Sequence, residues 1–316
     1  MHIGIDLGGT NIAAALVDAE GNIVKRASRP TNAGEGAQSV ISRLHQVCEE
    51  LMSKDTMSTE DVTLESIGIG VPGSVDREKG TVIFTPNLPL SGASIAAELE
   101  ERFGCPVNLG NDANCAALGE TVAGGAKGAK DVIFVTLGTG VGGGIITGGR
   151  LYTGFNGAAG EIGHTVIIAD GRECGCGRHG CWEAYASASG LVKTTIGCMT
   201  VHPASLLWEL CGGDTGKIDG RMVFNAFRTG DQAAAQAVEV YIRHLAAGIV
   251  NLINILEPEL ICVGGGLSNA WDCIAGPLQA EVDAGKYTRG SEDLAQTRIV
   301  KANLGNDAGI IGAAML

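Results

Sequence analysis

The chain has 316 residues, of which 45% are hydrophobic, 4% are aromatic and 49 are glycine. This apolar content is too high for a disordered protein, and the glycines lack the three-residue repeat of collagen. Lysine and arginine number 22 against 35 aspartates and glutamates, so the formal net charge is −13. This charge disfavours nucleic acid and anionic membrane surfaces as partners, although it permits an anionic ligand in a locally positive pocket. A chain of this length is expected to form two domains.

The N-terminal residues have neither the basic segment nor the apolar segment of a secretory signal. The longest apolar stretch, residues 238–256, is interrupted by Arg243, His244 and Asn251 and does not predict a membrane span. We therefore expect a cytoplasmic protein. In that compartment its ten cysteines are thiols or metal ligands rather than disulfides.

Short β-rich runs alternate with helical stretches along the chain, which is typical of an α/β fold. Strands are predicted, in chain order, at 2–5, 12–17, 66–71, 107–109, 132–135, 141–146 and 260–263. Helices are predicted at 40–51, 94–103, 115–122, 238–256 and 310–314. Residues 157–190 are expected to form a loop.

The strand, turn and strand that open the chain recur from Val132 onward. Aligning Leu7 with Leu137 places Asp6 opposite Thr136 and Gly8 opposite Gly138. This predicts two related domains with a glycine hairpin at the same place in each. Coincidence is the alternative, because glycine between strands is common.

Three glycine turns, each directly after a β-rich run, indicate a nucleotide site. Glycine lets backbone N–H groups approach a phosphate, and neighbouring Thr and Asn side chains add donors. Asp6, at the end of a buried strand, is expected to hold a hydrated Mg²⁺. A single glycine turn is usually only a turn, and the Walker A and Rossmann patterns are absent. The candidate nucleotide-binding residues are Asp6, Gly8, Gly9, Thr10, Asn11, Gly138, Thr139, Gly140, Gly265 and Gly266.

A cluster of metal-ligand residues lies in the predicted loop. His164, Cys174, Cys176 and Cys181 supply one imidazole and three thiolates, which is the ligand set of a closed structural zinc site. His179 is a competing imidazole within the tight turn between Cys176 and Cys181. The alternative interpretation is a surface loop whose cysteine thiols bind no metal.

Three acidic residues are candidates for contact with a substrate. Asp112 follows a strand, where it can cap a helix or accept the proton of a hydroxyl that attacks a phosphoryl group; the residues alone leave both roles open. Glu161 and Glu183 flank the cysteine loop. A loop fixed by zinc would hold both carboxylates rigidly enough to recognise hydroxyls, whereas the alternative is plain surface solvation.

These motifs resemble the ROK family of sugar kinases and repressors over essentially the whole chain, and most of all its glucokinases. The resemblance rests on DLGGTN at 6–11, NDAN at 111–114, LGTGVG at 137–142, EIGH at 161–164, CGCGRHGCWE at 174–183 and GGG at 264–266. It implies a two-domain actin-like, ribonuclease-H-like α/β fold with ATP and sugar in the interdomain cleft. The implied domains are residues 1–112 with 305–316, and residues 113–304 with a zinc loop at 164–181. One departure is Ala169, where the family often has proline.

The resemblance also implies roles for individual residues. Asp112 would be the catalytic base toward the 6-hydroxyl of a hexose, and His164 would bind zinc through one ring nitrogen and a sugar hydroxyl through the other. The implied sugar contacts are Asn87, Asn111, Asp112, Glu161, His164 and Glu183. ATP, Mg²⁺ and a structural Zn²⁺ would be the cofactors, in a homodimer or homotetramer.

The implied activity is ATP-dependent phosphorylation of a hexose, with glucose as the first expectation. The sequence does not exclude N-acetylmannosamine, fructose or allose as the sugar substrate. It also does not exclude polyphosphate as the phosphoryl donor. A sugar-responsive regulator without turnover is the alternative from another class of protein. Family repressors carry an N-terminal helix-turn-helix domain, whereas this sequence starts inside the first strand and keeps Asp112, so the kinase is favoured.

Overall fold

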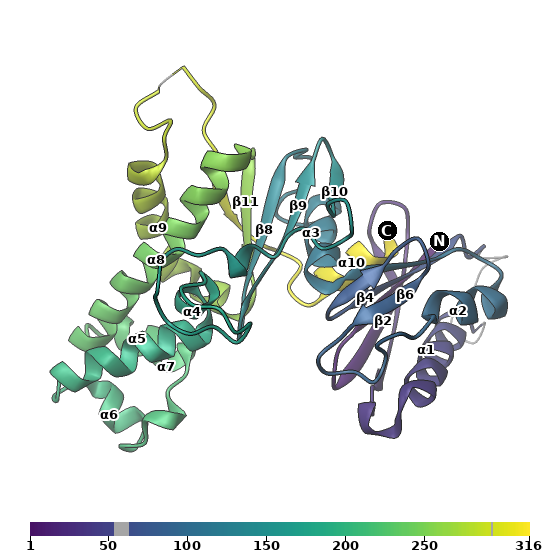
Figure 1. Ribbon diagram of the computed structural model, residues 1–316, viewed down its shortest axis with the longest axis horizontal. Coiled ribbons are helices and arrows are strands. Elements are labelled where there is room, and N and C mark those ends of the chain that lie inside the picture. Colours follow the sequence, from purple (N-terminus) through teal and green to yellow (C-terminus); the bar gives the residue numbers. More distant parts are fainter. Residues whose placement is uncertain (54–62, 292) are drawn as a thin grey trace. The chain divides into compact units, whose positions relative to one another are not determined.

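The computed structural model describes residues 1–53, 63–291 and 293–316 (Figure 1). They form two compact units, one of residues 1–134, 144–160 and 302–316 and the other of residues 135–143 and 161–301. Residues 113–134 and 144–160, assigned above to the larger domain, thus pack with the N-terminal unit. The physical reason is α3 (Asp112–Val122), which lies against α10 (Asp307–Ala314) and against Gly144.

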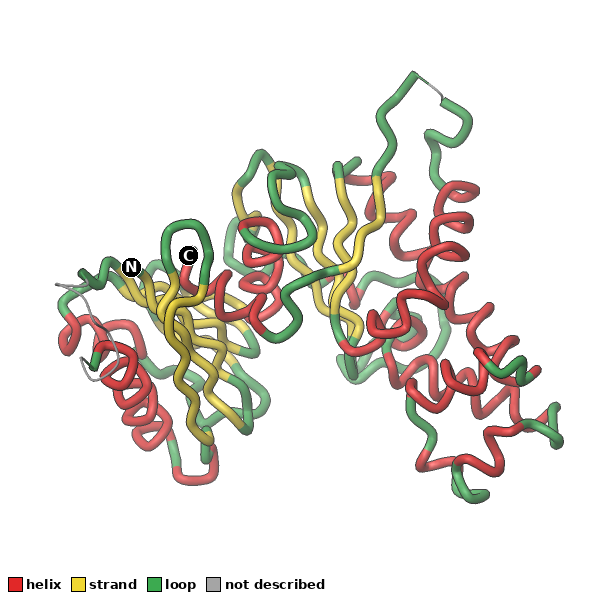
Figure 2. The backbone as a smooth tube through the Cα atoms, turned by 180° about the vertical axis from the view of Figure 1, so that it is seen from behind, coloured by secondary structure: helices red, strands yellow, loops and turns green. Residues whose placement is uncertain are grey.

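The first sheet has five strands in the order β3-β2-β1-β4-β7. β1 runs antiparallel to β2 and parallel to β4, and β4 runs parallel to β7. Helices α1 and α2 lie on one face of the sheet and α3 and α10 on the other (Figures 1 and 2). The bounds are β1 (His2–Leu7), β2 (Asn11–Val17), β3 (Ile23–Pro30), β4 (Ser66–Val71), β7 (Val107–Asn111), α1 (Ala37–Met52) and α2 (Ile95–Phe103).

The second sheet repeats this order of strands as β10-β9-β8-β11-β12. Its bounds are β8 (Val132–Leu137), β9 (Val141–Thr147), β10 (Arg150–Tyr152), β11 (Leu260–Gly264) and β12 (Arg298–Lys301). As in the first sheet, a hairpin of the first two strands continues into a third strand, and later strands add on the other side. The shared strand order confirms the duplication that the two glycine hairpins predicted.

Apolar periodicity places the core as expected. The predicted helical stripe of α1 is buried, with Val40, Leu44 and Leu51 fully covered. The long helix α8 (Gln232–Leu256) buries a similar stripe and packs against α5 (Ala188–Val201), α7 (Gly220–Arg228) and α9 (Trp271–Gly285). α8 is long and apolar enough to cross a membrane by length and composition alone. Its packing within the unit is that of a core helix.

The first unit requires glycine where α10 crosses the sheet. A Cβ atom on Gly4 would collide with the carbonyl oxygen of Ile310, and one on Gly68 would collide with that of Ala313. Gly312 in turn lies against the backbone of Cys115 in α3. Part of the glycine excess therefore allows α10 to pack in direct backbone contact with its neighbours.

Several elements escaped prediction because their segments are short or lack a clear period. In the first unit these are β3, the hairpin of β5 (Ser74–Asp76) and β6 (Thr81–Phe84), and β10. In the second unit they are α4 (Glu183–Ala186), α5 (Ala188–Val201), α6 (Leu206–Leu210), α7 (Gly220–Arg228), α9 (Trp271–Gly285) and β12. The predicted loop at 157–190 therefore ends earlier, since α4 starts at Glu183 and α5 at Ala188.

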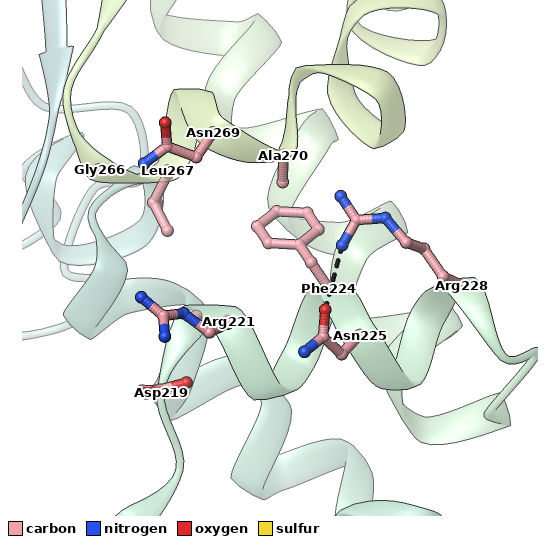
Figure 3. Close-up of a pocket in the computed structure, with 10 residues that line it drawn as sticks. Asp219, Arg221, Phe224, Asn225, Arg228, Gly266, Leu267, Asn269 and Ala270 are labelled. Carbon is pink, nitrogen blue, oxygen red and sulfur yellow. Dashed lines mark hydrogen bonds between the residues drawn. The ribbon is translucent and has the colours of Figure 1, made fainter. Parts of the chain in front are cut away.

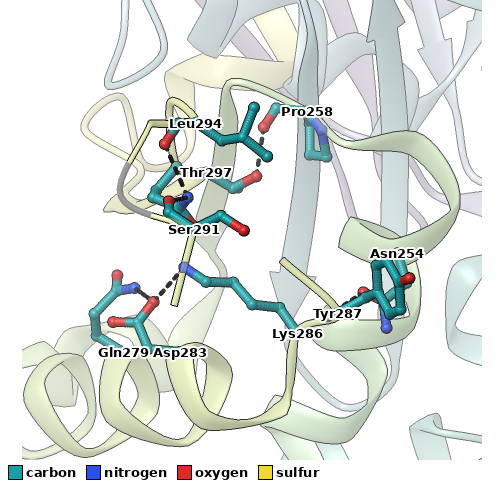
Figure 4. A network of polar contacts seen from close by, with 10 residues as sticks. Asn254, Pro258, Gln279, Asp283, Lys286, Tyr287, Ser291, Leu294 and Thr297 are labelled. Carbon is teal, nitrogen blue, oxygen red and sulfur yellow. Dashed lines mark hydrogen bonds and ion pairs between the residues drawn. The ribbon is translucent and has the colours of Figure 1, made fainter. Parts of the chain in front are cut away.

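A polar network holds Lys286, Tyr287 and Thr297, which lie between α9 and β12 (Figure 4). The ammonium of Lys286, 7% exposed, lies 2.6 Å from Asp283 Oδ1. Thr297 Oγ1 donates to the carbonyl of Pro258 at 2.7 Å, and Asn254 Oδ1 accepts the N–H of Tyr287 at 2.9 Å. These bonds tie Tyr287 to the end of α8 and Thr297 to the residues that precede β11.

The buried carboxylate of Glu120 holds the chain where it returns to the first unit. Glu120 is fully buried in α3, and its oxygens accept the N–H groups of Gly125 at 2.7 Å, Asn303 at 3.0 Å and Leu304 at 2.8 Å. An ionised acceptor with several N–H donors makes stronger hydrogen bonds than a neutral one. Glu120 therefore fixes the segment that leads into α10.

Glu120→Gln is expected to lower the free energy of unfolding by about 2–3 kcal/mol, because the amide NH₂ faces buried N–H donors and leaves them unsatisfied. Urea unfolding monitored by circular dichroism measures the change. Glu101→Gln, at an exposed position of α2, is the control and should stay within about 0.5 kcal/mol of wild type. Equal stability of the two variants would contradict the role of Glu120.

Candidate functional site

The first predicted phosphate turn is the hairpin between β1 and β2. Gly8 N–H donates to the Asn11 carbonyl at 3.0 Å, which closes the turn. Thr31, fully buried after β3, donates from Oγ1 to the Gly8 carbonyl at 2.6 Å and from N–H to the Thr10 carbonyl at 2.9 Å. These bonds occupy carbonyl oxygens of the turn. Thr31 is not predictable from the local sequence, because its only signal is that it follows β3, a strand that the sequence did not predict.

Asp6 lies near the end of β1 in a mostly buried position. Burial raises the pKa of Asp6 to about 6, and the negative charge of Asp112 adds to the rise. A Cβ on Gly309, in α10, would lie 3.5 Å from the Asp6 carboxyl carbon, so the helix backbone covers this carboxyl group. Two carboxyl groups close enough to repel each other are suited to share a cation.

The structure brings the other predicted residues of the first unit close to this turn. Asn87 lies beside Gly9, since a Cβ on that glycine would be 3.6 Å from the Asn87 Cβ. Asn111 is the N-cap of α3: its Oδ1 accepts the N–H groups of Ala113 at 2.9 Å and Asn114 at 3.2 Å. Asn111 Nδ2 also donates to the Gly73 carbonyl at 3.1 Å. Asn111 is therefore the N-cap, and Asp112, the exposed first residue of the helix, also accepts the N–H of Ala113 with its Oδ1 at 2.9 Å.

The predicted metal ligands converge in the second unit. One ligand atom each from His164, Cys174, Cys176 and Cys181 lies within 4.8 Å of all the others. The Cys176 and Cys181 sulfurs are 3.7 Å apart, and the Cys174 sulfur is 3.7 Å from His164 Nδ1. His164 is the last residue of a single 3₁₀ turn at Ile162–His164. Two β-bridges, Val166 to Cys181 and Glu173 to His179, fold the loop upon itself.

These separations fit a tetrahedral ion. Zinc–sulfur bonds of about 2.3 Å and zinc–nitrogen bonds of about 2.0–2.1 Å imply S···S distances of about 3.8 Å and S···N distances of about 3.6 Å. The measured distances of 3.7 Å agree with both. His164 faces the cluster with Nδ1, so the geometry assigns Nδ1 as the candidate ligand and leaves Nε2 for another contact. His179 is not part of the group of converging atoms.

The thiols of this cluster differ in their acidity without a metal. Burial raises the pKa of Cys174 to about 12 and also raises that of Cys181. A backbone hydrogen bond from Arg178 lowers the pKa of the exposed Cys176. The two buried thiols need a bound cation to ionise near neutral pH, so metal binding here would release protons.

Glu183 connects the metal loop to the second predicted phosphate turn. Its Oε2 accepts the N–H of Val141 at 3.0 Å, and its Oε1 accepts the Cys174 thiol at 3.4 Å. Gly138 N–H donates to the Gly140 carbonyl at 3.0 Å and so closes the turn between β8 and β9. Glu161, the other predicted carboxylate, is exposed and precedes the 3₁₀ turn that carries His164.

The third glycine turn borders a cavity of about 540 Å³ (Figure 3). Gly265 adopts a left-handed backbone with φ 82° and lies against Leu137, which leaves no room for a side chain there. The Phe224 ring projects from α7 toward the segment that follows the glycines. The lining residues are Asp219, Gly220, Arg221, Phe224, Asn225, Arg228, Gly266, Leu267, Asn269 and Ala270.

Most of this lining was not predicted from the sequence, because more than half of it lies on or directly before α7, a helix that the sequence did not predict. Arg228 is engaged by Asp272, with its Nε and Nη2 at 2.9 and 2.7 Å from the two carboxylate oxygens. The apolar ring and the nearby polar groups suit a flat heterocycle, and the volume is within the usual range of small-molecule sites. The cavity is therefore the candidate base or ribose site of the glycine turn at 264–266.

Each unit thus gathers its own share of the predicted residues. The first unit holds Asp6, the turn at Gly8 and Gly9, Thr10, Asn11, Asn87, Asn111 and Asp112. The second holds the turn at Gly138, Thr139 and Gly140, the metal ligands, Glu161, Glu183, Gly265 and Gly266.

Comparisons with known proteins define the class. The family model of the ROK family matches residues 2–316, so the chain belongs to the ROK family. The glucokinase of Streptomyces coelicolor is 37% identical over 318 residues, which cover 100% of this chain and 97% of the relative. The fold is the two-domain, actin-like fold of the sugar kinases of this family.

Two solved structures are similar along almost the whole chain. One is a ROK family glucokinase from Streptomyces griseus in complex with glucose and AMPPNP, with 36% identity, a TM-score of 0.78 and coverage of 99% of this chain and 98% of that one. The other is a ROK hexokinase from Thermus thermophilus, with 31% identity, a TM-score of 0.80 and coverage of 99% and 96%.

Asp6→Asn is expected to stabilise the protein at neutral pH. Because the folded-state pKa of Asp6 is raised to about 6 from 3.8, the native fold prefers the protonated acid. Wild type should lose stability as the pH rises from about 4 to above 6, while the neutral amide avoids this cost. The variant should therefore exceed wild type by about 1–3 kcal/mol at pH 7.5.

Urea unfolding at several pH values measures this difference, which should shrink steadily below pH 6 as Asp6 is protonated. The exposed Asp293 offers a matched control, since Asp293→Asn should leave the free energy of unfolding at pH 7.5 within about 0.5 kcal/mol of wild type. A variant less stable than wild type at pH 7.5 would contradict the buried charge at Asp6.

Proposed function

We propose that this protein is an ATP-dependent hexose kinase that transfers the γ-phosphoryl group of ATP to the 6-hydroxyl of glucose. The observation that carries the proposal is the placement of Asp112 as the exposed first residue of α3, near Asp6 and the glycine turn after β1. The similarity to glucokinases along the whole chain supports glucose as the hexose.

In this proposal Asp112 orients the 6-hydroxyl and accepts its proton. The hydroxyl oxygen forms a bond to the γ-phosphorus while the bond from that phosphorus to the bridging β–γ oxygen breaks. The electron pair of the broken bond leaves with ADP, and the sugar product carries the phosphoryl group. The main work of the protein is positioning and charge stabilisation, as in other phosphoryl transfers.

Hydroxyl recognition falls to the residues on and around the metal loop. Glu161 and Glu183 would accept hydrogen bonds from sugar hydroxyls, and His164 would use Nε2, the nitrogen that does not face the cysteines. Asn87 and Asn111 would contribute from the first unit. Asn111 has a second role here, since its cap sets the direction in which Asp112 leaves the helix.

Two turns would bind the phosphates of ATP, one formed by Gly8, Gly9, Thr10 and Asn11 and the other by Gly138, Thr139 and Gly140. The nucleoside would lie against Gly265 and Gly266, in the cavity beside α7. Mg²⁺, when bound, would neutralise charge on the transferring phosphate. Asp6 would hold it through its carboxylate. The cation would also offset the repulsion between Asp6 and Asp112, which adds to the effect of burial in raising the pKa of Asp6.

The metal loop would hold one structural Zn²⁺ with His164, Cys174, Cys176 and Cys181 as its four ligands. The ligand chemistry and the 3.7 Å separations support this assignment. Four protein ligands close the coordination sphere, so this ion would shape the loop and take no part in the chemical step. We further propose a cytoplasmic homodimer or homotetramer.

An ADP-release assay with glucose, fructose, N-acetylmannosamine and allose tests the proposed function. Glucose should give the highest kcat/KM, and ATP should exceed polyphosphate as donor. Asp112→Asn should lower kcat at least about 100-fold, because loss of a general base costs about that factor. If wild type bound sugar without turnover, a sugar-responsive regulator would be favoured instead. If Asp112→Asn kept more than about a tenth of the wild-type kcat, the role of Asp112 as base would be refuted.

Metal content tests the zinc site separately. Wild type should hold one zinc per chain by elemental analysis, and Cys181→Ser should hold far less because a hydroxyl is a poor replacement for a thiolate. Cys198→Ser, at a buried cysteine of α5 outside the cluster, is the control and should keep its zinc. Wild-type zinc content in Cys181→Ser would show that the ion binds elsewhere.

A further inference from the structure

We infer that the segment 181–189, which leads from the last cysteine of the metal cluster into α5, positions the turn at residues 138–141 and thereby sets the affinity for nucleotide. The inference rests on the proposed function, which assigns phosphate binding to this turn. It makes Ala188, Ser189 and Glu183 positioning residues for nucleotide, in addition to the sugar contact proposed for Glu183.

Three hydrogen bonds join the segment to residues 138, 139 and 141 of the turn. The N–H of Ala188 donates to the Gly138 carbonyl at 2.8 Å, and Ser189 Oγ donates to the Thr139 carbonyl at 3.1 Å. Glu183 Oε2 accepts the Val141 N–H at 3.0 Å. A Cβ on Gly140 would collide with the same Glu183 oxygen, so the contact is also a close one.

These bonds decide which side of the turn faces an anion. Carbonyl oxygens repel phosphate, and the segment engages those of Gly138 and Thr139 with its own donors. The N–H groups of Thr139 and Gly140 take part in none of these three bonds and are the donors that a phosphate would use. The segment therefore helps the turn to present its donor side.

The segment is itself anchored to the metal cluster and to the core of the second unit. Cys181, the first residue of the segment, is a fully buried candidate ligand of the cluster. Trp182, fully buried, donates from Nε1 to the His244 carbonyl at 3.0 Å, and its indole fills the space above Gly248 of α8. Displacement of the cluster would therefore be transmitted to the turn.

Ala188→Pro removes the first of the three bonds with little change to the local backbone. Ala188 is the first residue of α5, where proline is well tolerated, and Ser187 before it is extended with ψ 170°, as the residue before a proline must be. The ring carbon would occupy the place of the N–H hydrogen and push the Gly138 carbonyl away. We expect ADP to bind at least about tenfold more weakly, measured by calorimetry without sugar.

Gln232→Pro is the matched control, because Gln232 is the exposed first residue of α8 and follows the extended Asp231. It should bind ADP like wild type, and both proline variants should keep the zinc content of wild type. If Ala188→Pro does not fold, Ser189→Ala decides, since loss of its single bond should weaken ADP binding about threefold.

The inference would be overturned if the folded Ala188→Pro variant bound ADP within about twofold of the wild-type affinity. If that variant does not fold, unchanged ADP affinity in Ser189→Ala would overturn it. Either result would leave the proposed kinase activity intact. Failure of wild type to bind ADP at all would overturn the proposed function and the inference with it.

Discussion

The convergence of one imidazole and three thiols is the constraint on which the candidate site depends most. The loop that contains them has a single 3₁₀ turn and two isolated β-bridges as regular structure, so little else in the loop fixes its shape. A structural zinc ion contributes on the order of 10 kcal/mol of binding energy to a fold. With that energy the loop can hold Glu161, His164 and Glu183 in fixed directions and can support the neighbouring turn at 138–141.

The first unit meets a different physical demand, which is to keep two acidic groups close together. Burial and repulsion raise the pKa of Asp6 to about 6, so the empty fold carries an electrostatic cost at neutral pH. The apolar core between the first sheet and its helices stabilises the unit against that cost. A bound cation would offset this cost, and such electrostatic strain is common in sites that bind charged ligands.

The sequence predicted much of this arrangement because its signals are local. The ligand set of His164, Cys174, Cys176 and Cys181 could be read from residue type and spacing, and the structure brings these atoms together. The duplicated hairpin could be read from aligned glycines, and the order of strands in the two sheets repeats accordingly. α1 and α8 were predictable because each buries a continuous apolar stripe.

What the sequence did not reveal depends on contacts between distant residues. Nothing near Thr31 signals that its hydroxyl would hold the Gly8 carbonyl, and nothing near Glu120 signals that it would bind the backbone of Leu304. The close packing of Gly4 and Gly68 on α10 likewise depends on a helix more than 200 residues away in sequence. The lining of the cavity beside Phe224 remained hidden because α7 is short. In each case the partner is specified by the fold and not by a local pattern.

X-ray absorption at the zinc edge of the purified protein tests the central claim most directly, since it reports the ligands of the ion that would organise the site. The account predicts three sulfur atoms at about 2.3 Å and one nitrogen at about 2.0–2.1 Å in a four-coordinate shell. A shell dominated by oxygen and nitrogen, or one with two or fewer sulfur atoms, would contradict it.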